Sequence, residues 1–132
     1  MKKTSVATLK KKLQTIFNLY IRLRDCGEKG WAHCISCDKV LQFDQTQAGH
    51  FWSVGAYPAV RFDERNVHVQ GACCNTFKHG NLLEYQPRLI DKIGQQAYDE
   101  LKHDRSIAKK YTVFDLQEMI EIYTNRVKEL QR

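Results

Sequence analysis

The chain has 132 residues, a length typical of one domain. Hydrophobic residues make up 42% and charged residues 27% of it, as in a globular protein, and no apolar run is long enough for a transmembrane helix. Five cysteines, an odd number with no secretory leader after Met1, argue against a disulfide framework and favour thiols or metal ligands in a cytoplasmic protein.

The net charge of +6 is concentrated at the N-terminus. Residues 1–30 carry eight Lys or Arg against two acidic residues, whereas residues 31–80 and 81–132 are each neutral overall. A basic segment on a neutral body indicates contact with a phosphate backbone, although a solvated helix face has the same composition. We expect Lys10, Lys11 and Lys12 to face DNA, because they lie mostly away from the apolar positions of this segment.

The N-terminal segment is predicted to be a helix over residues 5–25. Apolar side chains from Leu9 to Leu23 recur at spacings of three and four, Thr4 or Ser5 can cap the start, and Gly27 ends it. This helix and the basic residues around it form the first part of the chain, residues 1–30.

Residues 31–80 lose the helical period and hold four of the five cysteines. The short runs 39–43 and 47–53 are predicted to pair as a hairpin with its turn at 44–46. Residues 67–70 are predicted to form a strand and residues 74–79 a short helix, which Gly80 stops. This is the expected core of the domain.

Residues 81–132 are predicted to be helical. Asn81 and Glu84 have the spacing of a capping box for a helix that ends at Gly94 and that kinks or restarts at Pro87. A short helix over 95–102 follows, and a capping box at 112–115 opens the last helix, 113–130. The apolar faces of helices 5–25 and 113–130 suit a homodimer surface and packing within one chain equally well.

A metal site is predicted from Cys34-x-x-Cys37, because two thiolates on one tight turn supply half of a tetrahedral zinc site. The second half is irregular, because Gly71 stands three residues before Cys74, where a second Cys-x-x-Cys would place its first thiol. The open candidates for the fourth ligand are Cys73, His68, His33 and His79. We prefer Cys73, which gives the zinc set Cys34, Cys37, Cys73 and Cys74. The alternative is that the cysteines pack as small hydrophobic residues without metal.

Three further residues fit the hydrolysis of a phosphodiester. His50 is the candidate general base, because a neutral imidazole can take a proton from water. Asn66 is expected to hold the strand that carries His50, and the side-chain oxygen of Asn75 is expected to bind Mg²⁺ or Mn²⁺.

A carboxylate for that cation is missing from the expected place. In many HNH nucleases, which this order of residues resembles, a carboxylate directly precedes the histidine, but position 49 in this sequence is a glycine. His68, Asp63 or Glu64 could supply a ligand instead.

The order Cys-x-x-Cys, His50, Asn66 and Cys74-Asn75 resembles the HNH (His-Me finger, ββα-metal) nucleases, here in an HNN version. The sequence also resembles the NinG (Rap) recombination proteins of lambdoid phages. The blocks that carry this second resemblance are Cys34–Cys37, Ala48–Phe51, Arg61–His68, Cys74-Asn75, Gly80–Tyr85 and Leu89–Gly94.

These resemblances imply an α+β fold, a small ββα-metal core with a zinc knuckle flanked by N- and C-terminal helices. They imply a structure-selective endonuclease of branched DNA, such as Holliday junctions and D-loops, in the cytoplasm of a bacterial host. On this basis His50, Asn66, His68 and Asn75 take active-site positions and Cys34, Cys37 and Cys74 metal positions.

This interpretation predicts DNA contacts and a homodimer, and two other functions remain possible. We expect Arg61, Arg65 and Lys78 to contact DNA, and a homodimer to supply the two cuts that a four-way junction needs. Gly49 and Gly71 favour a different function, a zinc-dependent DNA-binding module without catalysis. A general HNH nicking endonuclease, with no preference for branches, is a third possibility.

Overall fold

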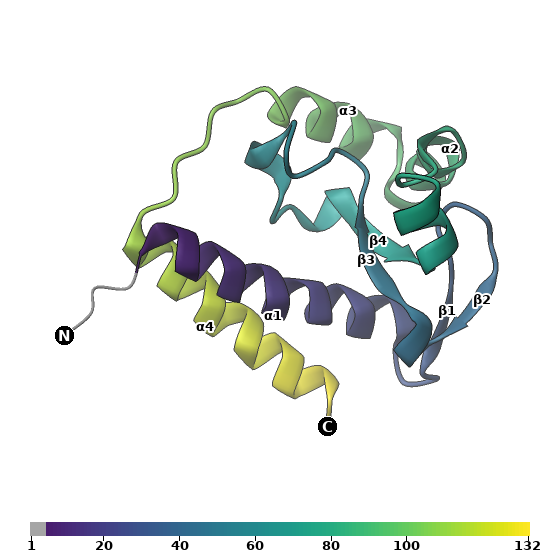
Figure 1. Ribbon diagram of the computed structural model, residues 1–132, viewed down its shortest axis with the longest axis horizontal. Helices are drawn as coiled ribbons and strands as arrows, with labels where there is room; N and C mark the ends of the chain where they lie inside the picture. The colour runs from purple at the N-terminus through teal and green to yellow at the C-terminus, as the bar shows by residue number, and fades with distance from the viewer. Residues whose placement is uncertain (1–4) are drawn as a thin grey trace.

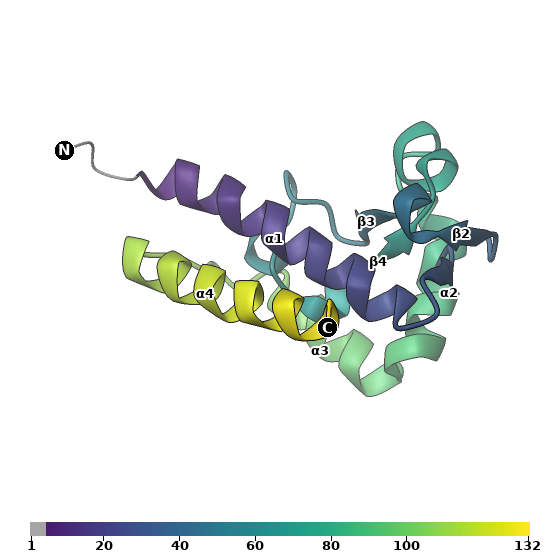
Figure 2. The ribbon, with the colours of Figure 1, turned by 90° about the horizontal axis from the view of Figure 1, so that it is seen from below.

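A computed structural model describes residues 5–132, so Lys2, Lys3 and Thr4 lie outside the described residues. Two long helices, α1 (Val6–Cys26) and α4 (Val113–Leu130), lie side by side (Figures 1 and 2). Both predicted starts are confirmed. The Ser5 hydroxyl accepts a hydrogen bond from the Thr8 N–H, and Thr112 and Asp115 form a reciprocal capping box.

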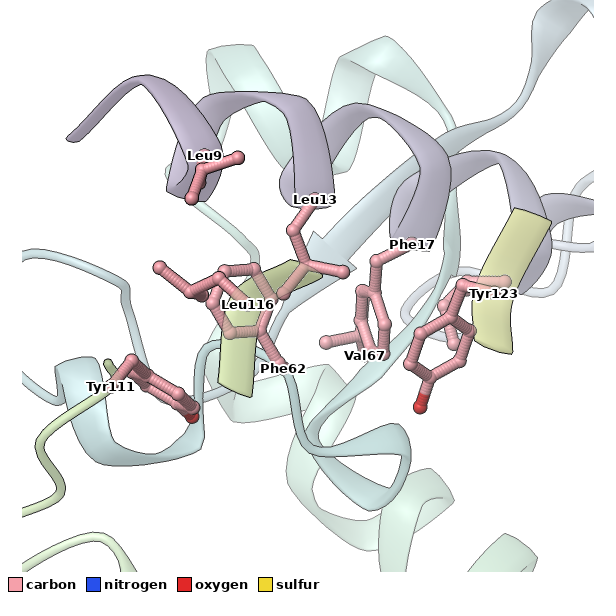
Figure 3. Close-up of a cluster of buried hydrophobic side chains, with 9 residues drawn as sticks. Leu9, Leu13, Phe17, Phe62, Val67, Tyr111, Leu116 and Tyr123 are labelled. Atoms are coloured by element: carbon pink, nitrogen blue, oxygen red, sulfur yellow. The ribbon is translucent and has the colours of Figure 1, made fainter. Parts of the chain in front are cut away.

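The apolar stripes of these two helices meet inside one chain. Leu13 and Phe17 of α1 lie against Leu116 and Tyr123 of α4, with Val67 beneath them (Figure 3). The rings of Phe17 and Tyr123 meet edge to face with centroids 5.0 Å apart. The buried part of each stripe is therefore core within one chain, whereas Phe114, Ile122 and Leu130 of α4 remain exposed.

Four short strands form two antiparallel pairs. Strands β1 (Trp31–His33) and β2 (Val40–Gln42) pair with each other, and β3 (Gln47–His50) pairs with β4 (Val67–Gln70). The predicted pairing of residues 39–43 with 47–53 is therefore wrong. A 3₁₀ turn over Phe43–Gln45 separates β2 from β3, and β3 finds its partner beyond a sixteen-residue connection, residues 51–66, that contains 3₁₀ turns at Pro58–Val60 and Glu64–Asn66.

The chain leaves β4 through a π-helix, Cys73–Phe77, and continues into α2 (Leu82–Ile93) and α3 (Gln95–Asp104). The predicted capping box at Asn81 is absent. Asn81 has left-handed backbone angles, and its side-chain amide lies 3.5 Å from the Cys74 sulfur instead. Helix α2 is one element that includes Pro87, so it does not restart there.

Helix α1 links the parts of the molecule, because it contacts α4 as well as strands β3 and β4. Helices α2 and α3 contact each other and enclose a second core, in which Phe51, Tyr85 and Leu101 are buried. The result is a small mixed α+β domain with its N- and C-terminal helices packed together. No helix among the described residues is long and apolar enough to span a membrane.

Candidate functional site

Three cysteines converge where the β1–β2 hairpin meets the π-helix. Cys34 and Cys37 lie on the turn between β1 and β2, and Cys74 lies in the π-helix. The three sulfur atoms lie within 4.8 Å of one another. Thiolates bound tetrahedrally to one zinc ion at about 2.3 Å stand roughly 3.8 Å apart, so this cluster needs little adjustment to hold a metal such as zinc.

The surroundings of Cys34 favour a thiolate. Burial opposes ionisation, but the backbone N–H groups of Gly71, Ser36 and Cys37 donate to its sulfur and set the Cys34 pKa below its usual value. Burial raises the pKa of Cys74 to about 11, so the third thiol ionises readily only when a cation compensates the charge. The donor set therefore fits a soft divalent metal.

The fourth ligand expected from the sequence, Cys73, lies outside this cluster. Its side chain is exposed, and no fourth His, Cys, Asp or Glu of residues 5–132 joins the three thiols. The physical reason is the π-helix, which buries Cys74 and turns the preceding residue outward. Cys73 and the three clustered cysteines line one cavity of about 400 Å³, which also contains Asp44.

His50 is the last residue of β3. Its Nε2 lies 2.9 Å from the carbonyl oxygen of Arg61, and because a carbonyl only accepts, Nε2 carries the proton and Nδ1 keeps a free lone pair. Burial lowers the His50 pKa, and the charge of Arg61 lowers it further against the opposing effect of the carbonyl. At neutral pH the ring is therefore neutral and able to accept a proton.

Asn66 fixes the chain directly after His50. Its fully buried side chain accepts a hydrogen bond from the Trp52 N–H at 2.8 Å and donates to the carbonyls of Trp52 and Val60 at 3.0 and 3.1 Å. Its own carbonyl accepts from the Phe51 N–H at 2.9 Å. These contacts are the backbone bonds near His50 that the sequence predicts for Asn66, and they orient the imidazole.

The missing carboxylate at position 49 has a steric explanation. A Cβ on Gly49 would lie 1.8 Å from Gln70 Oε1, and the buried Gln70 cannot move freely because its Nε2 donates to Ser36 Oγ and to the Gly80 carbonyl, both at 2.7 Å. The Gly49 carbonyl also accepts from the Tyr85 hydroxyl at 2.8 Å. The neighbouring packing thus leaves no room for an aspartate.

Asn75 lies in the π-helix, at the opposite end of β3 from His50. Its Nδ2 donates to Gln47 Oε1 at 2.8 Å, which leaves its Oδ1 free of this contact. Magnesium prefers carboxylates and phosphate oxygens, and the described residues contain no cluster of His, Cys, Asp or Glu ligands besides the three cysteines. Asn75 alone is a weak site for the predicted Mg²⁺ or Mn²⁺.

His68 has a structural environment, which corrects the active-site position expected from the sequence. Both ring nitrogens are occupied: Nε2 donates to the Arg65 carbonyl at 2.9 Å, and Nδ1 accepts from Arg24 at 3.2 Å. Burial, together with the charges of Lys92 and Arg24, lowers the His68 pKa to about 3. Its side chain is therefore a buried neutral hydrogen-bonding group and not a free base or metal ligand.

A sequence model of the family described as Bacteriophage Lambda NinG protein matches residues 1–132. The chain belongs to the NinG family. Proteins named ninG from Escherichia phage 933W, Salmonella phage P22 and Escherichia phage lambda are 38%, 37% and 36% identical to it over 121 residues. These matches cover 92% of this chain and 56% or 57% of each relative, so the chain spans little more than half of their length. No solved structure matches it.

The basic residues predicted to contact DNA in this NinG-family chain differ in their exposure and in their ion pairs. Lys11, Lys12 and Lys78 are exposed and form no ion pair with the described residues. Arg61 is half-buried, and its Nε donates to Gln14 at 3.1 Å. Arg65 is different, because Asp63 and Asp104 hold its guanidinium at 2.6 and 2.8 Å. Arg65 therefore fastens α3 to the 51–66 connection and is not free for DNA.

Other residues near the NinG-family site have no signal in the sequence. Gln47 accepts a hydrogen bond from Asn75, and Gln70 donates one to the Gly80 carbonyl, only because β3 pairs with β4.

A further lysine lies beside α1. Lys109 lies 5.5 Å from the centre of the Tyr111 ring, and Lys10 lies 5.9 Å from the same centre. The C-terminal part of the chain thus adds a cation beside the basic face of α1.

Proposed function

We propose that this NinG-family protein is a structure-selective DNA endonuclease that hydrolyses phosphodiester bonds in branched recombination intermediates. Strands β3 and β4 with the π-helix would be its small ββα core. The observation that carries the proposal is His50, a neutral imidazole with a free Nδ1 lone pair on a strand that Asn66 holds in place. The preference for branched DNA follows from the resemblance to the NinG (Rap) recombination proteins.

In the proposed reaction, His50 Nδ1 takes one proton from a water molecule as the water oxygen attacks phosphorus. The bond between phosphorus and the 3′ oxygen breaks, and that oxygen leaves with the bonding electrons and takes a proton from solvent. His50 then releases its proton. A positioned general base of this kind accelerates hydrolysis by about 10²- to 10⁴-fold.

Two metals have separate roles in this proposal. Zinc at Cys34, Cys37 and Cys74 would hold the β1–β2 turn against the π-helix, as structural zinc sites do. Mg²⁺ or Mn²⁺ would stabilise charge on the phosphate oxygens. Asn75 Oδ1 is the protein group that would contact this second ion. Because Asn75 lies at the opposite end of β3 from His50, oxygen atoms of DNA and water would have to complete the shell of the ion and connect it to the phosphate beside His50.

The DNA would lie along the basic face of α1 and reach the end of β3. Arg61 adjoins His50, because its backbone carbonyl accepts a hydrogen bond from the imidazole Nε2. Its guanidinium forms no ion pair with the described residues. Lys10, Lys11 and Lys12 would extend this contact along α1. Two symmetric cuts in a four-way junction would require a homodimer.

A second function, a zinc-dependent DNA-binding module without catalysis, is favoured by one observation. Gln70 occupies the space that a carboxylate at position 49 needs, so the cation site lacks its usual acidic ligand. This alternative predicts tight binding to DNA and no cleavage with any divalent ion.

The test is cleavage of a labelled four-way junction in Mg²⁺ or Mn²⁺, beside a linear duplex of the same arm sequence. We expect paired cuts near the branch, slower cutting of the duplex, and a loss of at least about 100-fold in rate for His50→Ala with binding nearly unchanged. Cleavage that survives in metal-stripped and reconstituted His50→Ala would refute the assignment of the base. Binding without cleavage would indicate the DNA-binding module, and equal cutting of both substrates a general nicking enzyme.

A further inference from the structure

The segment between the π-helix and the first turn of α2 exposes large apolar side chains. Phe77 is 77% exposed, Leu83 is 90% exposed and Leu82 is 45% exposed, and all three lie within seven residues of the sequence. This segment, residues 77–83, projects from the body of the molecule beside β2 and β3 (Figure 2). Exposed apolar side chains gathered in this way mark surfaces that bind something.

The backbone of residues 77–83 is held in an unusual conformation. His79, Gly80 and Asn81 have positive φ values of 50°, 93° and 47°, a region that is uncommon for residues other than glycine but that histidine and asparagine enter more often than most. Contacts with the surrounding structure hold these three consecutive residues in this conformation.

The enforcing contacts come from the metal cluster and its supports. The Gly80 N–H donates to the Cys74 carbonyl at 2.8 Å, and the Gly80 carbonyl accepts from Gln70 Nε2 at 2.7 Å and from Ser36 Oγ at 3.3 Å. The Lys78 N–H donates to the Cys73 carbonyl at 3.0 Å. The base of the segment is therefore anchored while its apolar side chains point away from the core.

Residues 77–83 contain one lysine and no acidic residue, which suits a nucleic acid, and the exposed Glu84 follows directly after them. Lys78 follows Phe77 directly, is exposed, and forms no ion pair with any acidic residue among residues 5–132. Asn75, the residue proposed to contact the second metal ion, lies two positions before Phe77 in the same π-helix. DNA bound at the proposed site would therefore run past Phe77, with Lys78 placed to meet a phosphate.

We propose that Phe77 stacks against an unpaired or unstacked base at the branch point of the DNA and so determines the preference for branches. Proteins that distort DNA insert apolar side chains of this type between base steps, and aromatic side chains stack on exposed bases. Bases at a branch are the least costly to reach, because they are incompletely stacked. This inference rests on the proposed function, since it names the feature of the substrate that the same site recognises.

A second copy of the chain is the other possible occupant of this surface. A stable interface between proteins uses about 20–30 residues on each side. Three exposed apolar side chains interrupted by Lys78 and His79 supply far less than this. The observations therefore favour a base, and a small contact area suits a wedge that enters a gap already present in the substrate.

The experiment compares Phe77→Ala with Phe114→Ala. Phe114 is a matched control, because it is 71% exposed but lies in the first turn of α4. Cleavage rates on the four-way junction and on the linear duplex are measured for both variants. Since losing one base stacked on an aromatic side chain costs about 5- to 150-fold, we expect Phe77→Ala to lower the junction-to-duplex ratio of cleavage rates by roughly that factor. Phe114→Ala should keep the wild-type ratio.

A second readout separates this inference from the proposed function. Junctions with 2-aminopurine at the branch change fluorescence when that base leaves the DNA stack, and this requires no cleavage. If the wild type cuts no DNA, the proposed function fails, but a fluorescence change that disappears in Phe77→Ala still supports the wedge. An unchanged ratio, an unchanged fluorescence response, or a dimer in sedimentation analysis that Phe77→Ala converts to monomer would each overturn it.

Discussion

Gly49 and Gln70 form a pair whose interdependence can be measured. Replacing Gly49 by Ala would place a Cβ 1.8 Å from Oε1, 2.6 Å from Cδ and 2.9 Å from Cγ of Gln70. No side chain can accept such distances, so either the strand or the glutamine has to move. Because β3 is paired to β4 at every residue, we expect Gln70 to move.

The cost of this movement follows from what Gln70 contacts. Its amide donates two hydrogen bonds of 2.7 Å, to Ser36 Oγ and to the Gly80 carbonyl, and its side chain is fully buried. Losing two buried hydrogen bonds costs about 2–3 kcal/mol, and residual overpacking adds roughly 1 kcal/mol. We therefore expect Gly49→Ala to lower the free energy of unfolding by about 3–4 kcal/mol. The clash is absent in the double variant Gly49→Ala, Gln70→Ala. The loss of stability in this double variant should therefore be smaller than the sum of the two single losses by about 1–3 kcal/mol.

Urea unfolding of the four members of this cycle, followed by circular dichroism, measures the coupling. Gly55→Ala is the control, because a Cβ there meets no atom within 4 Å, and it should leave the stability within about 0.5 kcal/mol of the wild type. The reasoning is refuted if Gly49→Ala is as stable as Gly55→Ala, or if the losses of Gly49→Ala and Gln70→Ala add without coupling. In either case the packing of Gln70 would not explain why a carboxylate is missing at position 49.

Three further predictions test the remaining parts of the site. Cys74→Ser should abolish zinc binding and lower the melting temperature, whereas Cys73→Ser should keep one zinc per chain by elemental analysis; loss of metal from both variants would place Cys73 in the site. Folding lowers the pKa of His68 from 6.5 to about 3, so between these pH values only the unfolded chain binds a proton at His68. The free energy of unfolding is therefore unaffected by His68 above about pH 6.5, and it decreases by up to about 1.4 kcal/mol per pH unit as the pH falls towards 3. Urea midpoints against pH should show this slope, and His68→Gln should flatten it; an equal slope in the variant would exclude His68 as the cause. Changing all of Lys10–Lys12 to Gln should reduce the dependence of log Kd on log salt by about 0.9 for each phosphate that a lysine no longer neutralises, whereas Arg65→Gln should leave that dependence unaltered.

The sequence by itself determined the helices and the three cysteines that cluster in the structure. Serine and threonine caps with apolar spacings of three and four define α1 and α4, because these signals act over one turn of helix. Cys34, Cys37 and Cys74 were likewise predicted as metal ligands from spacing and resemblance, and their thiols come together in the structure. Asn66 was expected to bond to the backbone near His50, and it bonds to Trp52.

The tertiary structure decided which segments pair and which side chains remain free. Strand β3 could pair with β2 or β4 on local propensity alone, and burial of Val67 and Val69 against α1 and the cysteine cluster selects β4. That choice places Gln70 against Gly49, His68 against Arg24, and Arg65 between two aspartates. Such contacts join residues up to 44 positions apart. No local pattern encodes them, because their free energy comes from burial and charge in the folded molecule.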